Sequence, residues 1–76
     1  MQKVVSGVYE HYSGKRYEVV GLAKHSESLS DMVVYRPLYK VDKEFRGYLW
    51  VRPMKMFLGN ARVGGKIVQR FKKIEE

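Results

Sequence analysis

The segment GVYEHYSGKRYEVVGLAKH (7–25) decides the architecture of this chain. Two runs rich in tyrosine and valine flank Ser13-Gly14, a dipeptide typical of tight turns. Strict alternation in the second run puts Tyr17 and Val19 on one face of an extended strand and Glu18 on the other. The segment therefore predicts a β-hairpin with strands at residues 7–12 and 15–25.

The rest of the chain also reads as short strands separated by turns. Gly21 predicts a bend or bulge in the second strand, and Pro37 indicates an edge or a bulge in the third. Five strands are expected in all, the last three at residues 32–36, 48–52 and 67–74, with one helical turn at 53–57 and an irregular connection at 59–65. This pattern predicts an all-β fold, a small SH3-like antiparallel barrel, closed or half-closed. The alternative is an open five-stranded sheet packed against a short helix.

The length of 76 residues allows one domain, with an ordered core expected at about residues 7–74. Hydrophobic residues make up 45% and charged residues 30%, as in ordinary soluble globular proteins. The absence of cysteine excludes disulfides, a thiolate nucleophile and cysteine-ligated zinc. We find neither an export signal nor an apolar run long enough to span a membrane, and we expect a cytoplasmic protein without membrane contact.

Positive charge is the strongest compositional signal. Fifteen basic residues face eight acidic ones, which gives a net charge of +7. Such a field favours polyanionic partners, whereas the plain alternative is a set of solvated surface charges. Basic residues are densest near the C-terminus, at Lys66, Arg70, Lys72 and Lys73.

One polar cluster is formed by His25-Ser26-Glu27, with His11 at the end of the preceding strand. Two histidines and a carboxylate have the chemistry of a metal site or of a general acid and base. No HExxH, CxxC, nucleophile elbow or phosphate-binding glycine loop accompanies them. The favoured interpretation is structural: Ser26 and Glu27 hydrogen-bond backbone amides of a loop, and both histidines are half exposed. We therefore expect no catalytic residues, no metal and no cofactor.

Rings and arginines alternate in MVVYRPLY (32–39) and YLWVRPMKMF (48–57). If Leu49, Val51 and Val34 point inward, then Tyr35, Trp50 and Arg52 form an outward or groove-lining patch; the opposite register buries Trp50. Arg52 is expected either to clamp a phosphate or carboxylate, or to pair with Glu18, Glu27 or Asp31. For Arg36 the ion pair is favoured. Met54, Met56 and Phe57 are expected to plug one end of the barrel.

The ordered strings GVYEHY, HSE, VVYRPLY, LWVRPMKMF and RFKKI resemble a family of small bacterial domains of unknown function. The resemblance extends from Gly7 to Ile74. It implies a shared fold and a shared site, and it supplies no activity, substrate or cofactor.

These observations favour a non-catalytic binding module for single-stranded nucleic acid or a nucleotide-like anion on a basic aromatic face. One alternative is an SH3-like module that binds a protein or peptide partner. Another is a small metal or acid–base enzyme that uses His11, His25 and Glu27. The candidate ligand-binding residues are His11, His25, Ser26, Glu27, Tyr35, Trp50, Arg52 and Arg70.

Overall fold

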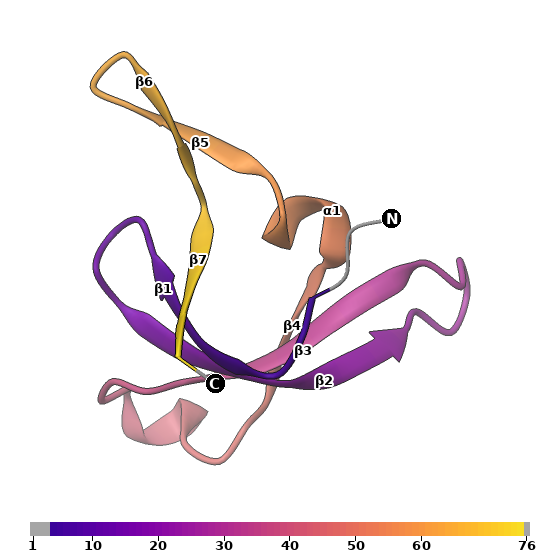
Figure 1. Ribbon diagram of the computed structural model, residues 1–76. Coiled ribbons are helices and arrows are strands. Elements are labelled where there is room, and N and C mark those ends of the chain that lie inside the picture. The colour runs from indigo at the N-terminus through magenta and orange to yellow at the C-terminus, as the bar shows by residue number, and fades with distance from the viewer. Residues whose placement is uncertain (1–3, 76) are drawn as a thin grey trace.

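The computed structural model describes residues 4–75, which form two antiparallel sheets (Figure 1). The larger sheet has five strands in the order β4-β3-β2-β1-β7, and β5 pairs with β6 in a separate hairpin. The elements are β1 (Gly7–His11), β2 (Arg16–Lys24), β3 (Asp31–Pro37), a 3-10 turn (Lys43–Phe45), β4 (Trp50–Pro53), α1 (Met54–Phe57), β5 (Asn60–Val63), β6 (Lys66–Gln69) and β7 (Phe71–Glu75). The prediction of an all-β antiparallel fold is confirmed. The predicted closure into a barrel is not confirmed, because β4 and β7 are the two edges of the larger sheet, which stays open.

The first hairpin is as predicted. Tyr9 of β1 pairs with Tyr17 of β2, and both rings are buried. Gly14 in the connecting turn has φ +97°, a conformation that glycine adopts without steric cost. The hairpin therefore carries two aromatic rings into the core from adjacent strands.

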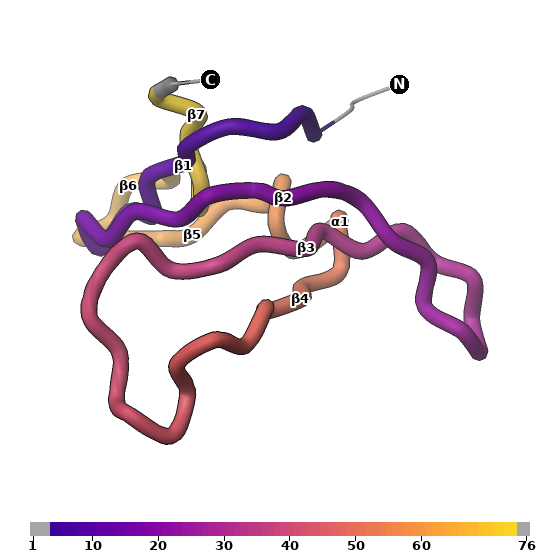
Figure 2. The backbone as a smooth tube through the Cα atoms, turned by 90° about the horizontal axis from the view of Figure 1, so that it is seen from below, coloured from indigo at the N-terminus to yellow at the C-terminus, as the bar shows by residue number. Residues whose placement is uncertain are grey.

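A bulge bends β2 where Gly21 predicted it. The pairing with β3 shifts register between Val19 and Gly21, because Val19 faces Tyr35 whereas Gly21 faces Val34. Bulges increase the local twist of a sheet. The larger sheet is strongly curved, and α1 and β7 lie over its concave side (Figures 1 and 2).

The interpretation of Pro37 as the mark of an edge strand was wrong. β3 lies between β2 and β4, so it is an interior strand. Pro37 is its last residue and pairs with Tyr17, whereas the last pair with β4 joins Tyr35 and Trp50. The ladder with β4 has ended before Pro37, so its missing N–H leaves no gap there.

The core fills the concave side of the sheet. It consists of Val4, Tyr9, Tyr17, Val19, Val33, Tyr35, Phe57 and Phe71, with Tyr39, Trp50 and Met54 packed against it. Phe57 of α1 is 1% exposed and stacks on Phe71 of β7, with ring centroids 4.2 Å apart. The helical turn thus covers the core as expected, although Met56 is 50% exposed and does not contribute a plug.

The predicted final strand at 67–74 is in fact two strands. β6 ends at Gln69 and β7 begins at Phe71, with Arg70 between them. The segment expected to be irregular supplies β5, which pairs with β6 through a turn at Gly64 and Gly65. This hairpin projects away from the larger sheet (Figure 1). Between residues 4 and 75 we find no helix with the length and apolar character needed to cross a membrane.

Candidate functional site

Trp50 and Arg52 lie on the concave face of the sheet. Their cross-strand partners are Tyr35 and Val33, and both partners are buried. Leu49 and Val51, at the alternate positions of this segment, are the exposed ones. The register is therefore the opposite of the one that would form an outward patch of Tyr35, Trp50 and Arg52.

The two rings of that expected patch differ in accessibility. Tyr35 is 2% exposed, so its ring cannot stack on a ligand, and its proposed role in direct binding fails. Trp50 is only partly buried; its ring packs against the core at 6.4 Å from that of Tyr35. Trp50 keeps part of its surface available beside the concave face.

Arg52 is held by two contacts on this face. Its Nε donates a hydrogen bond to the Tyr35 hydroxyl oxygen at 3.3 Å, and its Cζ lies 5.3 Å from the centre of the Phe71 ring. Such cation–π contact stabilises a guanidinium without neutralising it. Arg52 makes no ion pair with any carboxylate of residues 4–75, so the expected pairing with Glu18, Glu27 or Asp31 is absent.

Arg36 behaves as predicted and explains why Glu18 does not reach Arg52. These two residues are cross-strand neighbours on the convex face, and Arg36 Nε donates to Glu18 Oε1 at 2.7 Å. Arg36 is thus part of a surface ion pair rather than of the concave face.

Arg70 connects α1 to β5. Its two Nη atoms donate to the carbonyl oxygens of Met56, at 3.0 Å, and Asn60, at 3.1 Å. Its own backbone N–H donates to the carbonyl oxygen of Gly59 at 3.1 Å. These bonds fix the break between β6 and β7 and hold the guanidinium in one place, again without an ion pair to any described carboxylate.

His11 lies on the same side of the sheet, against the Phe71 ring that Arg52 also contacts. Its ring is 5.0 Å from the Phe71 ring and 6.4 Å from the Tyr17 ring. Burial lowers the pKa of His11 below its ordinary value of 6.5, and the positive charges of Arg52, Arg70 and Lys15 lower it further. No carboxylate contributes to the shift in the opposite direction.

Lys15 and Tyr39 complete the surroundings of His11 and were not among the predicted ligand-binding residues. Lys15 Nζ lies 4.8 Å from the centre of the Tyr39 ring. The Tyr39 hydroxyl is 3.2 Å from that of Tyr17, and burial, with this hydrogen bond as the second cause, raises the pKa of Tyr17. The one sequence signal for Lys15 is its position: it follows His11 by four residues across the predicted Ser13-Gly14 turn, which brings it close to His11.

We call His11, Lys15, Arg52 and Arg70 the concave cationic site. Tyr39 and Trp50, both partly buried, lie at its aromatic margin. The four cationic or titratable side chains come from the end of β1, from the turn that follows it, from β4 and from the β6–β7 junction. The fold therefore gathers basic groups that are far apart in the sequence.

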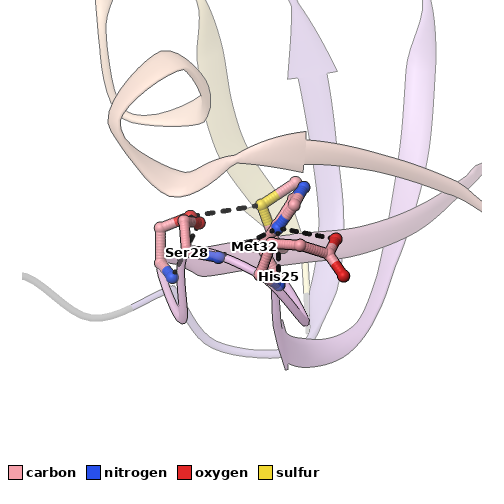
Figure 3. Close-up of polar contacts among 5 residues, drawn as sticks. His25, Ser28 and Met32 are labelled. Atoms are coloured by element: carbon pink, nitrogen blue, oxygen red, sulfur yellow. Dashed lines mark hydrogen bonds and ion pairs between the residues drawn. The ribbon is translucent and has the colours of Figure 1, made fainter.

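His25, Ser26 and Glu27 lie elsewhere, at the far end of β2. His25 Nδ1 accepts the backbone N–H groups of Glu27, at 3.2 Å, and Ser28, at 3.3 Å. The histidine itself therefore organises the loop, where Ser26 and Glu27 had been expected to do so. Figure 3 shows that the polar contacts of His25 and Ser28 stay within this turn and its junction with Met32.

The two histidines do not form a common site. β2 has nine residues and separates the turn after His11 from the turn at His25 (Figure 2). A strand of that length spans roughly 30 Å. Within residues 4–75 no three His, Asp or Glu side chains are placed to hold a metal ion, so the alternative site of His11, His25 and Glu27 is not assembled.

Comparison with known proteins places the chain in a family. The sequence profile described as "Protein of unknown function (DUF1653)" matches residues 7–73. The chain belongs to the DUF1653 family. The crystal structure of a DUF1653 protein from Bordetella bronchiseptica is similar to this DUF1653 chain with a TM-score of 0.83 and 31% sequence identity, over 97% of this chain and 91% of that one. No curated protein matches the sequence. The resemblance to a family of unknown function is thus confirmed, and its function must come from the site.

Proposed function

We propose that this DUF1653 domain is a non-catalytic binding module for nucleotide-like anions, single-stranded nucleic acid included, and that the concave cationic site is where it binds them. The observation that supports this function is the gathering of Arg52, Arg70 and Lys15 around His11 without a neutralising carboxylate among the described residues. By contrast, Arg36 on the convex face is neutralised by its ion pair with Glu18. An uncompensated cluster of fixed cations is the arrangement that anionic ligands require.

The aromatic margin favours a nucleotide over a simple inorganic anion. Stacking of a base on an aromatic side chain contributes about 1–3 kcal/mol per base and tolerates any base. Trp50 and Tyr39 are partly buried rings at the margin of the cations that can take this role. Phosphate groups would pair with the cations, and a base would lie against the rings. The proposed location is the cytoplasm, where such ligands are abundant.

The single tryptophan of the chain provides the test, because Trp50 lies at the aromatic margin of the site. Titration of the protein with a short single-stranded oligonucleotide should change the emission of Trp50 and give an affinity that falls steeply with salt. Arg52→Gln should weaken binding about tenfold, as expected for the loss of one charged contact. Arg62→Gln, the same change on exposed β5, should leave the affinity within about twofold. Equal effects of the two variants would show that binding is nonspecific attraction to a basic protein.

A peptide-binding function is the second candidate, and one observation favours it. Phe45, Tyr48 and Leu49, in the connection between β3 and β4, are exposed side chains of a kind that proteins use at interfaces. Together with Pro37 and Tyr39 they line a pocket beside this connection. Binding of a proline-rich peptide there should be nearly independent of salt and should be lost in Tyr48→Ala without any change in Arg52→Gln.

A further inference from the structure

We infer that the concave cationic site selects a terminal phosphate monoester, such as the end group of a mononucleotide or of a phosphorylated strand, over an internal phosphodiester. This inference rests on the proposed function and narrows its ligand class. It follows from two properties of the site: the supply of hydrogen-bond donors and the number of fixed charges.

The site presents donors and almost no acceptors. Arg52 is tethered through Nε, so both of its Nη groups remain without hydrogen bonds to residues 4–75. Arg70 uses each Nη once, and each Nη carries a second N–H. The tethers orient these guanidinium groups before any ligand arrives, which lowers the entropic cost of binding.

His11 adds a neutral donor. The backbone N–H of Ser13 donates to His11 Nδ1 at 3.1 Å, and the Ser13 hydroxyl lies 2.9 Å from the same atom. An Nδ1 that accepts an N–H carries no proton, so the proton of the neutral ring is on Nε2. Of the hydroxyls around the site, that of Tyr35 accepts from Arg52 Nε, and those of Tyr17 and Tyr39 are paired with each other. The partner must therefore be rich in acceptors.

Charge separates the two kinds of phosphate. Arg52, Arg70 and Lys15 provide three positive charges that act on His11, and Arg52 and His11 both contact the Phe71 ring. A phosphate monoester carries about −1.5 to −2 at pH 7 and offers three terminal oxygens. An internal phosphodiester carries a single negative charge and has two such oxygens. The monoester thus compensates more of the positive charge and accepts more of the available hydrogen bonds.

The test compares three ligands by isothermal titration calorimetry at fixed ionic strength: adenosine 5′-monophosphate, the diester-linked dinucleotide ApA without terminal phosphate, and adenosine. The monophosphate should bind at least about tenfold more tightly than ApA, and adenosine most weakly. As the pH falls, protonation of His11 adds positive charge for both ligands. Only the monophosphate dianion loses negative charge below about pH 6, so the ratio of the monophosphate affinity to the ApA affinity should fall there. The pH comparison needs only the wild-type protein and is independent of the folding of any variant.

Variants locate the preference. Arg52→Gln should reduce the affinity for the monophosphate to that for ApA, and the control Arg62→Gln should preserve the difference. If ApA binds wild type as tightly as the monophosphate, and Arg52→Gln weakens both, the selection of a monoester is overturned while the proposed function stands. If none of the three ligands binds, both the selection and the proposed function are overturned.

Discussion

The two ends of β2 carry the same local motif in opposite electrostatic settings. At each end a histidine Nδ1 accepts the backbone N–H of the residue two positions later, Ser13 after His11 and Glu27 after His25. Around His11 the neighbouring charges are cations from three parts of the chain. Around His25 a carboxylate lies at 3.8 Å, on Glu27, and Lys24 pairs with Asp31 at 2.7 Å. The comparison teaches that the histidine motif builds a turn, and that the charges brought to it by distant strands distinguish the proposed binding site from a structural loop.

The largest effect on stability is expected from loss of the Arg70 side chain, which hydrogen-bonds two backbone carbonyl oxygens at the His11 end. Arg70→Gln removes two charged hydrogen bonds to carbonyl oxygens and should lower the free energy of unfolding by about 1–2 kcal/mol, a discounted value because the bonds are exposed. It should also weaken anion binding. Chemical denaturation measures the first effect, and titration of the folded variant measures the second. Loss of stability with unchanged affinity would exclude Arg70 from the site and leave it a purely structural residue.

Lys15→Glu makes the His11 end resemble the His25 end by installing a carboxylate. The substitution replaces an attraction for the ligand by a repulsion and should reduce the affinity for a mononucleotide roughly tenfold. It should also raise the pKa of His11, because a cation that lowers this pKa is replaced by an anion. Calorimetry and NMR titration of the histidine ring measure the two effects. The control is Lys24→Gln at the other end, for which an equal loss of affinity would contradict the localisation.

His25→Ala tests the structural role of the opposite end. The variant leaves two amide N–H groups of an exposed turn without their acceptor and should lower the free energy of unfolding by about 0.5–1.5 kcal/mol. Anion affinity should be unchanged. His25→Asn should restore most of the stability, since an asparagine side chain can accept a backbone N–H two residues on. If the folded His25→Ala variant binds the nucleotide more weakly than wild type does, the loop takes part in binding and its purely structural role is contradicted.

His11→Gln should change the pH dependence of stability. The folded-state pKa of His11 is lower than 6.5, so below pH 6.5 the unfolded chain binds a proton that the folded protein resists. Stability is therefore lost as the pH falls from above 6.5 toward the lowered pKa, and it is fully present above 6.5. The variant should show a flatter dependence in this window, as measured by denaturation at a series of pH values. Wild type should lose stability more steeply than His11→Gln as the pH falls. Identical curves of stability against pH would contradict the surroundings assigned to His11.

The local features of the fold were readable from the sequence, whereas features set by distant contacts were not. The Ser13-Gly14 turn and the bulge at Gly21 follow from the conformational freedom of glycine, and both are present. The residues IVQRFKKI read as one strand, because nothing local shows that the Arg70 guanidinium binds carbonyl groups of α1 and β5. The arrangement of β4 and β7 as separate edges likewise depends on pairing across the whole chain.

The candidate site was predicted in part for the same reason. His11, Trp50, Arg52 and Arg70 were named, and the structure places them around one face. Alternation could not decide which face Trp50 and Arg52 occupy, because Leu49 and Val51 are also apolar and form an equally plausible inward set. Tyr35 was selected for its ring, yet that ring is sealed by the core. His25, Ser26 and Glu27 were selected for their chemistry, and they lie one strand length away from the cations.

The most direct test of the comparison is an amide NMR titration of the wild-type protein with adenosine 5′-monophosphate. We expect chemical-shift changes that saturate and concentrate at His11, Lys15, Trp50, Arg52 and Arg70, with residues 25–30 unaffected. Shift changes centred on residues 25–30, or spread evenly over the basic surface, would contradict the claim that unpaired cations around His11 make this end of the sheet the binding site.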